Sequence, residues 1–331
     1  MPLTIVQLDL IGRYLNIYLG SFMLIAGLLG SCINLWLFTR HRFRKSPCSR
    51  FVIASSLFDI LHLIVALFLR VLADGFGKDP ASSSVIGCRI RYYLITFSAY
   101  ASLGCRCLAS FDRYACTSRS ISFREWSSFK IAYNFLIINT FIWICFALPN
   151  FLYFNLVPIG PARVICHIAK KAYSNYFAYF VNPVLYFSLP LIIIITLAIK
   201  THKNLRLMNK TKRIKRLERR MASMIILQAI TNSISSIPYG IQFFYSVITF
   251  TSEKDEYRRA QENLFLQITR LSYYINFISA FYIYYVSSKQ IRSTIRRTIL
   301  RQKKLSTPST SSSSSSKNQF SDKYASRKSF K

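Results

Sequence analysis

The sequence predicts an all-α membrane protein, a bundle of seven transmembrane helices followed by a short amphipathic cytosolic helix. Of the 331 residues, 52% are hydrophobic, although the formal net charge is +32. The Lys and Arg residues fall between and after long apolar runs, whereas a nucleic-acid-binding protein needs its bases on one folded face. These two observations favour a membrane protein with basic loops over a partner of nucleic acid.

Seven apolar segments are long enough to cross a bilayer, which takes about 20 residues of helix. The sixth is the most polar, and polar residues are tolerated where a helix faces the interior of a bundle. The seven segments are 15–39, 50–73, 88–112, 131–154, 179–199, 221–248 and 266–287. The expected organisation is a short extracellular N-terminus, the bundle, an eighth helix and a disordered tail, at 1–14, 15–287, 288–304 and 305–331.

The loops between these segments differ strongly in charge. Of the 44 Lys and Arg residues, 31 lie in the alternate loops that include the C-terminal tail, and 10 lie in the loops that include the N-terminus. Because basic loops remain in the cytosol, we expect the N-terminus outside the cell and the C-terminus inside.

The tripeptide Asp112-Arg113-Tyr114 ends the third segment on the expected cytosolic side. Cys88 lies 25 residues before Arg113, and a helix of that length spans about 37 Å, one membrane with its headgroup edges. Cys166 lies in the outer loop after the fourth segment. Because the outer side is oxidising, we predict a Cys88–Cys166 disulfide. The other cysteines are expected to be core residues or free thiols: Cys32, Cys48, Cys105, Cys107, Cys116 and Cys145.

An Asp-Arg-Tyr tripeptide this far from an outer cysteine, in the third of seven spans, resembles the rhodopsin-like G-protein-coupled receptors. Asp59 matches the acid of the second span, Trp143 the tryptophan of the fourth, and Tyr284 the tyrosine that precedes the eighth helix. Pro190 and Pro238 match the kinking prolines of the fifth and sixth spans. The resemblance implies a plasma-membrane receptor, not an enzyme, that binds an extracellular ligand and activates a heterotrimeric G protein without a cofactor.

The resemblance also implies a switch. Arg113 would pair with Asp112 and with Glu218, twenty residues before Pro238, and hold the third and sixth helices together until an agonist separates them. The alternative is an interfacial arginine that reaches into the headgroups. Several positions depart from the family pattern, so we expect a divergent member with altered or constitutive signalling; they are Ser31, Ala198, Ser236, Ala280 and Phe281.

Asp59 has two possible partners within the membrane. The resemblance implies a sodium site made with Ser102 and Asn276. Arg106, however, lies one turn beyond Ser102 on the same helix face and is placed to pair with Asp59 directly. We favour the ion pair slightly over the sodium site. A transporter or channel that uses Asp59, Arg106 and Arg270 as pathway charges is the alternative function.

The ligand side of the expected receptor excludes two familiar classes. Ile95 stands where amine receptors carry an aspartate, and the seventh span has no lysine to bind retinal. The acidic residues of the loop 249–265 suggest steering of a basic peptide, and we favour a small neuropeptide. The alternative is a solvated loop with its own bases as partners. Candidate pocket residues are Arg91, Tyr92, Thr96, Tyr100, Tyr239, Gln242, Gln267 and Arg270.

The C-terminal region carries two further features. Basic residues alternate with Ile291 and Ile295 near helical spacing, which indicates an amphipathic helix lying on an anionic leaflet. Between Ser306 and Ser316 eight of the eleven residues are serine. Phosphorylation there would create a dense negative charge that arrestins recognise in members of the resembling family. The alternative is a plain flexible tail. No cluster of metal-ligating residues stands out.

Overall fold

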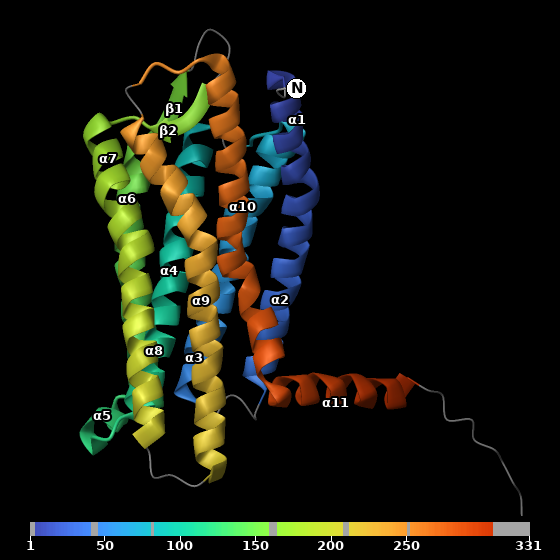
Figure 1. Cartoon of the computed structure of the whole chain (residues 1–331), viewed down its shortest axis with the longest axis vertical. Helices are drawn as coiled ribbons and strands as arrows, with labels where there is room; N and C mark the ends of the chain where they lie inside the picture. Colours follow the sequence, from blue (N-terminus) through green and yellow to red (C-terminus); the bar gives the residue numbers. More distant parts are fainter. Residues whose placement is uncertain are drawn as a thin grey trace, which may run out of the picture. The chain divides into compact units, whose positions relative to one another are not determined.

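The computed structural model describes residues 4–40, 46–80, 83–158, 164–207, 212–249 and 252–306, and of these it describes the backbone alone at 158, 164, 165, 212–222, 225, 229, 247 and 299–306. In this part of the chain seven long helical segments form a bundle, as the sequence predicts (Figure 1). The bundle belongs to a compact unit that ends at Ile291. From Arg292 the chain forms a second unit, helical to Ser306 as the continuation of α11 (Lys289–Ser306).

Three of the seven segments combine α-helix with π-helical turns. The first is α1 (Ile5–Tyr14), η1 (Leu15–Gly20) and α2 (Ser21–Thr39); the second is α3 (Pro47–His62), η2 (Leu63–Phe68) and η3 (Val71–Gly75); the fifth is α7 (Lys171–Tyr176), η4 (Phe177–Ser188) and α8 (Leu189–Leu207). The others are α4 (Val85–Thr117), α6 (Phe129–Tyr153), α9 (Lys212–Ile248) and α10 (Glu256–Ser287). A short α5 (Ile121–Glu125) lies in the loop between α4 and α6.

The helices extend beyond the apolar runs, and the first has a capping group at its start. The first begins at Ile5, ten residues before the start of the first predicted span. Thr4 caps it: the Gln7 N–H donates to Thr4 Oγ1 at 3.4 Å, and the Thr4 N–H donates to Gln7 Oε1 at 2.9 Å. Such a reciprocal box satisfies N–H groups that a helix start leaves free. Asn16 then donates to Gln267 Oε1 of α10 at 2.7 Å, which fixes this helix against the seventh.

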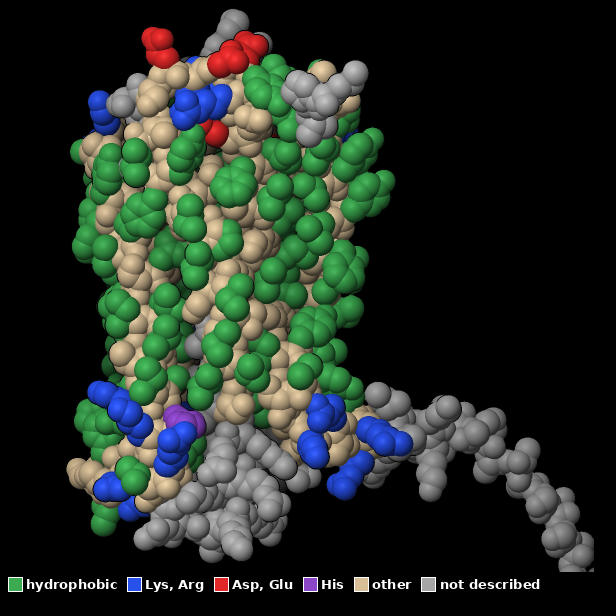
Figure 2. Space-filling view, in the orientation of Figure 1, with side chains coloured by type: hydrophobic (Ala, Val, Ile, Leu, Met, Phe, Trp, Pro, Cys, Tyr) green, Lys and Arg blue, Asp and Glu red, His purple; other side chains and the backbone are tan. Residues whose placement is uncertain are grey.

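Apolar side chains cover the middle of the bundle, and bases gather at one end of it (Figure 2). Five of the seven segments are apolar and long enough to cross a membrane; α9 and α10 are more polar. The polar side chains of α9 turn inward, as expected for a helix facing a bundle interior. Ser235 is buried and donates to Asn276 Oδ1 of α10 at 2.6 Å, and Gln228 and Asn232 are buried beside it.

Gly104 lets α4 and α6 approach closely. A Cβ at this position would collide with Asn139 Oδ1 of α6. Asn139 donates to the Ala101 carbonyl at 3.2 Å and accepts from Trp143 Nε1 at 3.0 Å. The amide of Asn139 is thus satisfied against the backbone of α4, as a buried polar group requires. Trp143 helps to hold the two helices together in this way.

The expected kinking prolines lie within helices. Pro238 lies inside α9, and Pro190 is the second residue of α8, directly after the π-helical η4. A further proline, Pro183, lies inside η4, and Ser188 donates to its carbonyl at 2.7 Å. Prolines and π-helical turns are both common sites of helix bending. The fifth segment therefore contains more such sites than Pro190, the one that the sequence predicted there.

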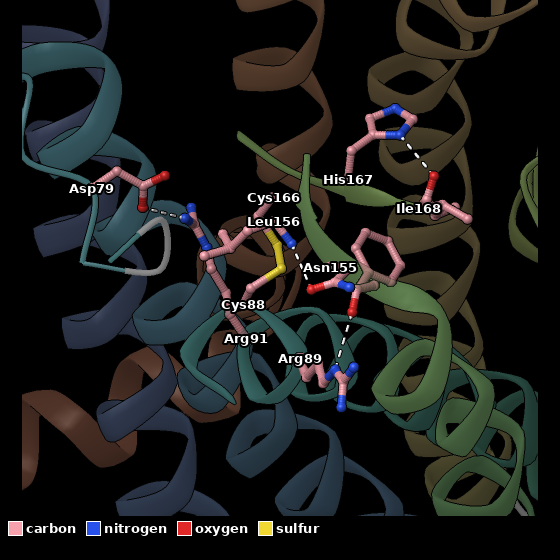
Figure 3. Close-up of a disulfide and its surroundings, with 10 residues drawn as sticks. Asp79, Cys88, Arg89, Arg91, Asn155, Leu156, Cys166, His167 and Ile168 are labelled. Atoms are coloured by element: carbon pink, nitrogen blue, oxygen red, sulfur yellow. Dashed lines mark hydrogen bonds and ion pairs between the residues drawn. A yellow bond between two sulfur atoms is a disulfide. The ribbon is translucent and has the colours of Figure 1, made fainter. Parts of the chain in front are cut away.

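A β-hairpin, which the sequence did not predict, lies in the outer loop between α6 and α7. It consists of β1 (Phe154–Pro158) and β2 (Val164–Ile168), which pair antiparallel with Leu156 opposite Cys166. Cys166 forms the predicted disulfide with Cys88 at the start of α4, with the two Cα atoms 5.7 Å apart (Figure 3). Arg89 also donates to the Phe154 carbonyl at 3.2 Å. The hairpin is therefore fastened to the outer end of α4. The other six cysteines are free thiols, as predicted.

Candidate functional site

The Asp-Arg-Tyr residues occupy the end of α4 remote from the disulfide. Arg113 and Asp112 are both buried, and Arg113 Nη2 donates to Asp112 Oδ2 at 2.5 Å. The same guanidinium nitrogen donates to Ser46 Oγ at 3.1 Å, and Asp112 accepts from Ser127 Oγ at 2.7 Å. A buried, paired guanidinium differs from an arginine that reaches into lipid headgroups. The ring of Tyr114 lies 5.7 Å below the Lys200 ammonium of α8.

Two further residues of the expected switch lie on other helices. Glu218 belongs to the first part of α9, where the structure describes the backbone alone, so its side chain lies outside the described residues. Tyr284 of α10 is buried and packs edge-on against Phe38 of α2, with the ring centroids 5.8 Å apart. It also lines a small internal cavity together with Arg106 and Gln228. From the seventh helical segment, Tyr284 therefore faces residues of the first, third and sixth.

Asp59 of α3 lies at the centre of a buried polar cluster. Its Oδ1 accepts from Arg106 Nη2 at 2.8 Å and from Ser102 Oγ at 2.5 Å, both on α4. Asp59 is 1% exposed and Arg106 is 7% exposed. The guanidinium of Arg106 also lies 5.3 Å from the ring centre of Phe277 on α10. Of the two arrangements that the sequence allowed, the ion pair is the one that the structure contains.

Asn276, the fourth residue predicted for this cluster, is instead bonded to α9. Besides accepting from Ser235, it donates to Ser236 Oγ at 2.7 Å. Ser236 is one of the positions that depart from the family pattern, and a hydroxyl at this position gives the Asn276 amide a partner on α9. Both ends of the Asn276 amide are thus hydrogen-bonded to the neighbouring helix, and its membership of an ion site with Asp59 stays a prediction.

An outer cavity of about 190 Å³ lies between the helices, on the side of the hairpin. Five of the eight predicted pocket residues line it: Tyr92, Thr96, Tyr100, Tyr239 and Arg270. Hairpin residue Phe154 lines it too and stacks on Tyr92, with the ring centroids 4.0 Å apart.

The other three predicted pocket residues do not line this cavity. Arg91 pairs with Asp79 of the preceding outer loop at 2.8 Å (Figure 3). Gln267 accepts the amide of Asn16 from the first helix, and Gln242 is buried outside the cavity lining. Helical spacing alone placed these side chains on the correct helices but did not reveal which polar groups would be taken up by neighbouring elements.

Sequence reasoning missed several residues of the cavity wall. Tyr186 of η4 and Tyr273 of α10 meet there, with hydroxyl groups hydrogen-bonded to each other and ring centroids 5.3 Å apart. His62 lies at the wall as well; it is buried, bonded to Ser98 Oγ at 3.1 Å and stacked on Phe277 with centroids 4.1 Å apart. A signal existed for His62, because it follows Asp59 by three residues and so shares its helix face.

Comparison with known proteins decides the class. The model of the family described as 7 transmembrane receptor (rhodopsin family) matches residues 30–280. The chain belongs to this family. No curated protein matches it closely enough to be named as a relative.

Family membership defines what this receptor does in outline. Rhodopsin-family receptors span the membrane several times, bind an extracellular ligand and signal through a G protein, and they are not enzymes. The match extends from the first helix to the seventh, so it includes the Asp-Arg-Tyr site, the Asp59 cluster and the disulfide. The membership favours the receptor over the alternative of a transporter or channel.

A cluster of side chains ties the outer ends of α9 and α10. Glu262 accepts from Lys254 Nζ at 2.6 Å, from Tyr245 Oη at 2.9 Å and from Arg258 Nε at 3.2 Å. Partial burial alone would raise the pKa of Glu262, but the hydrogen bonds from Lys254 and Tyr245 outweigh it and hold the pKa below its ordinary value.

Because the pKa of Glu262 is depressed in the folded state, this tie stabilises the receptor at neutral pH and is lost as the pH falls through that depressed value. Glu262→Gln is expected to mimic this loss at neutral pH. Hydrogen exchange of the backbone at 252–262 should then be faster than in the wild type. Glu253→Gln, at an exposed position of the same loop, is the control, and equal exchange in both variants would contradict the tie.

Proposed function

We propose that this receptor binds its ligand in the outer cavity beneath the hairpin and activates a heterotrimeric G protein at the opposite end of α4. The observation that carries the proposal is the state of Arg113, which is buried and paired with Asp112 within hydrogen-bond reach of Ser46. An arginine paired in this way can act as a switch, because a competing partner can separate the pair with a free-energy change of a few kcal/mol.

The proposed orientation places the hairpin outside the cell and the Asp-Arg-Tyr site in the cytosol. The excess of basic residues in one set of loops supports it, and so does the disulfide, which forms in an oxidising compartment. The plasma membrane is the proposed location, since the ligand of such a receptor arrives from outside.

The proposed switch joins Arg113 to Glu218 across the third and sixth helices. Agonist binding would separate this pair, so that α9 moves outward at its cytosolic end and a G protein enters. Pro238 inside α9 provides a place for such a bend. Asp112, Tyr114 and Tyr284 would help to position Arg113 and the adjoining helices in the two states.

Glu218→Ala tests this latch directly. Loss of the carboxylate should favour the active arrangement and raise agonist-independent signalling several-fold, since a latch of 1 to 2 kcal/mol corresponds to roughly five- to thirtyfold in population. The control is Glu125→Ala, at an exposed acid of α5. Basal signalling that is unchanged by Glu218→Ala would contradict the latch.

The proposed ligand is a small peptide. Tyrosine and phenylalanine side chains dominate the cavity wall and offer rigid apolar faces with hydroxyl groups at their edges. A screen of a peptide library with a calcium or cyclic-AMP readout tests this ligand class, and activation by small acids but by no peptide would contradict it.

The C-terminal region is proposed to act on the cytosolic side. Its basic helix α11 would bind anionic lipids, and phosphorylation of the serines between Ser306 and Ser316 would recruit arrestin. Residues from 307 onward lie outside the described part of the chain, so sequence composition alone supports this part of the proposal.

A further inference from the structure

The outer cavity has a positive charge that the acidic outer loop does not share. Two arginines line it, Arg70 from the second helical segment and Arg270 from α10, and no Asp or Glu is among its described lining residues. The remaining wall consists of aromatic, small and neutral polar side chains, with His62 as the other ionisable base. The charge that the described cavity wall carries at neutral pH is therefore that of two guanidinium groups.

Within the described part of the chain, the guanidinium of Arg70 is only partly engaged, and that of Arg270 makes no ion pair. Arg70 donates one nitrogen to Asp74 at 2.9 Å, but its Nε is buried without a hydrogen-bond partner. No described carboxylate lies within ion-pair distance of Arg270. Both arginines act electrostatically on Tyr274, and Arg70 is hydrogen-bonded to it, so the two charges face the same part of the cavity wall.

Guanidinium groups that retain free N–H donors in a partly desolvated cavity favour an anion. A carboxylate accepts two parallel hydrogen bonds from one guanidinium, and the geometry of this pair suits planar oxygen acceptors. Tyr92 and Tyr239 also line the cavity, and a phenol hydroxyl can donate to an oxygen acceptor. A cationic ligand group would meet like charges there, at a cost that increases as water is excluded.

The charges of the outer loop do not argue for a basic ligand group either. Glu262 is engaged by Lys254 and Arg258 of its own region. Glu262 is therefore less available to steer a basic peptide. The wall of the outer cavity carries the positive charges of Arg70 and Arg270.

We propose that the part of the ligand that enters the outer cavity is a carboxylate, bound by Arg270 and Arg70. This inference depends on the proposed function, because it takes the outer cavity to be the ligand site. Two sources provide the same chemistry: the free C-terminus of a peptide, and a small aromatic or aliphatic acid. A ligand whose cavity-binding group is an amine or an amide is excluded.

Matched probes test the charge preference. The full-length receptor, purified in detergent, is heated with 3-phenylpropanoate, with 3-phenylpropanamide or with 3-phenylpropylamine, which share one ring and differ in the end group. We expect the carboxylate to raise the Tm, and the amide and the amine to require at least about tenfold higher concentration for the same shift. An equal or larger shift with the amide or the amine, or no shift with the carboxylate, would overturn the proposal.

Variants locate the effect. Arg270→Gln should weaken carboxylate binding at least about tenfold, whereas Arg270→Lys, which keeps the charge, should weaken it less. Arg259→Gln, at an exposed position of the same helix, should bind the carboxylate as the wild type does. If Arg270→Gln does not fold, the Arg270→Lys variant and the comparison of probes still decide. Carboxylate binding that is unaffected by either change at Arg270 would refute its role.

A further pair of probes separates the two sources of the carboxylate. N-acetylphenylalanine has the free C-terminal carboxylate of a peptide. In N-acetylphenylalaninamide an amide replaces this carboxylate, which removes the charge. Stronger binding of N-acetylphenylalanine than of 3-phenylpropanoate supports the proposal with a peptide C-terminus as the source, and the reverse supports it with a small acid. The Tm readout needs no G protein, so a failure of this proposal and a failure of the signalling proposal are distinguishable.

Discussion

Asp59→Asn is expected to lower the Tm of the receptor by several degrees and to reduce the amount that reaches the cell surface. The substitution leaves the charge of Arg106 buried without its carboxylate partner, and the loss of one member of a buried ion pair costs about 3–5 kcal/mol. Arg106 is 7% exposed, and Asp59 is its one ion-pair partner among the described residues. Thermal unfolding of the purified receptor measures the effect, with Asp9→Asn at an exposed position as the control.

The same pair distinguishes ion pairing from sodium binding. Exchanging the two charges, in the double variant Asp59→Arg and Arg106→Asp, should recover part of the lost stability because the pair is restored in reverse. Replacing sodium by potassium at constant ionic strength should leave the Tm of the wild type unchanged. A sodium-specific rise in Tm, or a charge exchange that recovers nothing, would count against the pair as the dominant partner of Asp59.

Removing the disulfide is expected to have the second large effect. The double variant Cys88→Ser and Cys166→Ser frees a hairpin that is joined to α4 across a sequence separation of 78 residues. Removing such a native crosslink lowers the free energy of unfolding by about 2–5 kcal/mol, in good part because the unfolded chain gains conformational entropy. Since Phe154 of the hairpin lines the outer cavity, ligand binding should weaken as well.

Two comparisons check this expectation by thermal unfolding. A reducing agent should lower the Tm of the wild type as the double substitution does, and it should leave the double variant unchanged. Cys145→Ser removes a free, exposed cysteine and should be neutral. A double variant with the Tm of the wild type would show that the hairpin is held by its other contacts, such as the Arg89 hydrogen bond.

The helices and the disulfide were predictable because their signals are local or simple in spacing. Apolar runs of membrane length identify spans, and one pair of cysteines at outer positions leaves little choice. The exact helix ends were not predictable from hydropathy, since capping groups such as Thr4 and Gln7 decide them. The β-hairpin was missed because Phe154 and its neighbours continue an apolar run and resemble the end of a span.

Side-chain neighbours across the bundle were harder to predict. The Asp59–Arg106 pair followed from the single helix face that Ser102 and Arg106 share, and the structure contains it. The position of Tyr186 in the cavity wall could not be predicted from the 3.6-residue period of a regular α-helix. Tyr186 lies in the twelve-residue π-helical η4, where each turn takes more residues and the faces shift relative to a regular helix.

The most direct test of the account measures nucleotide exchange on a heterotrimeric G protein by purified receptor in lipid vesicles. With a panel of G proteins and without agonist, the wild type is expected to accelerate exchange on at least one of them. Arg113→Ala should abolish that acceleration, whereas Arg119→Ala, at an exposed residue of the adjoining loop, should preserve it. Exchange by Arg113→Ala at the rate of the wild type would contradict the account, because the buried arginine would then not be the switch.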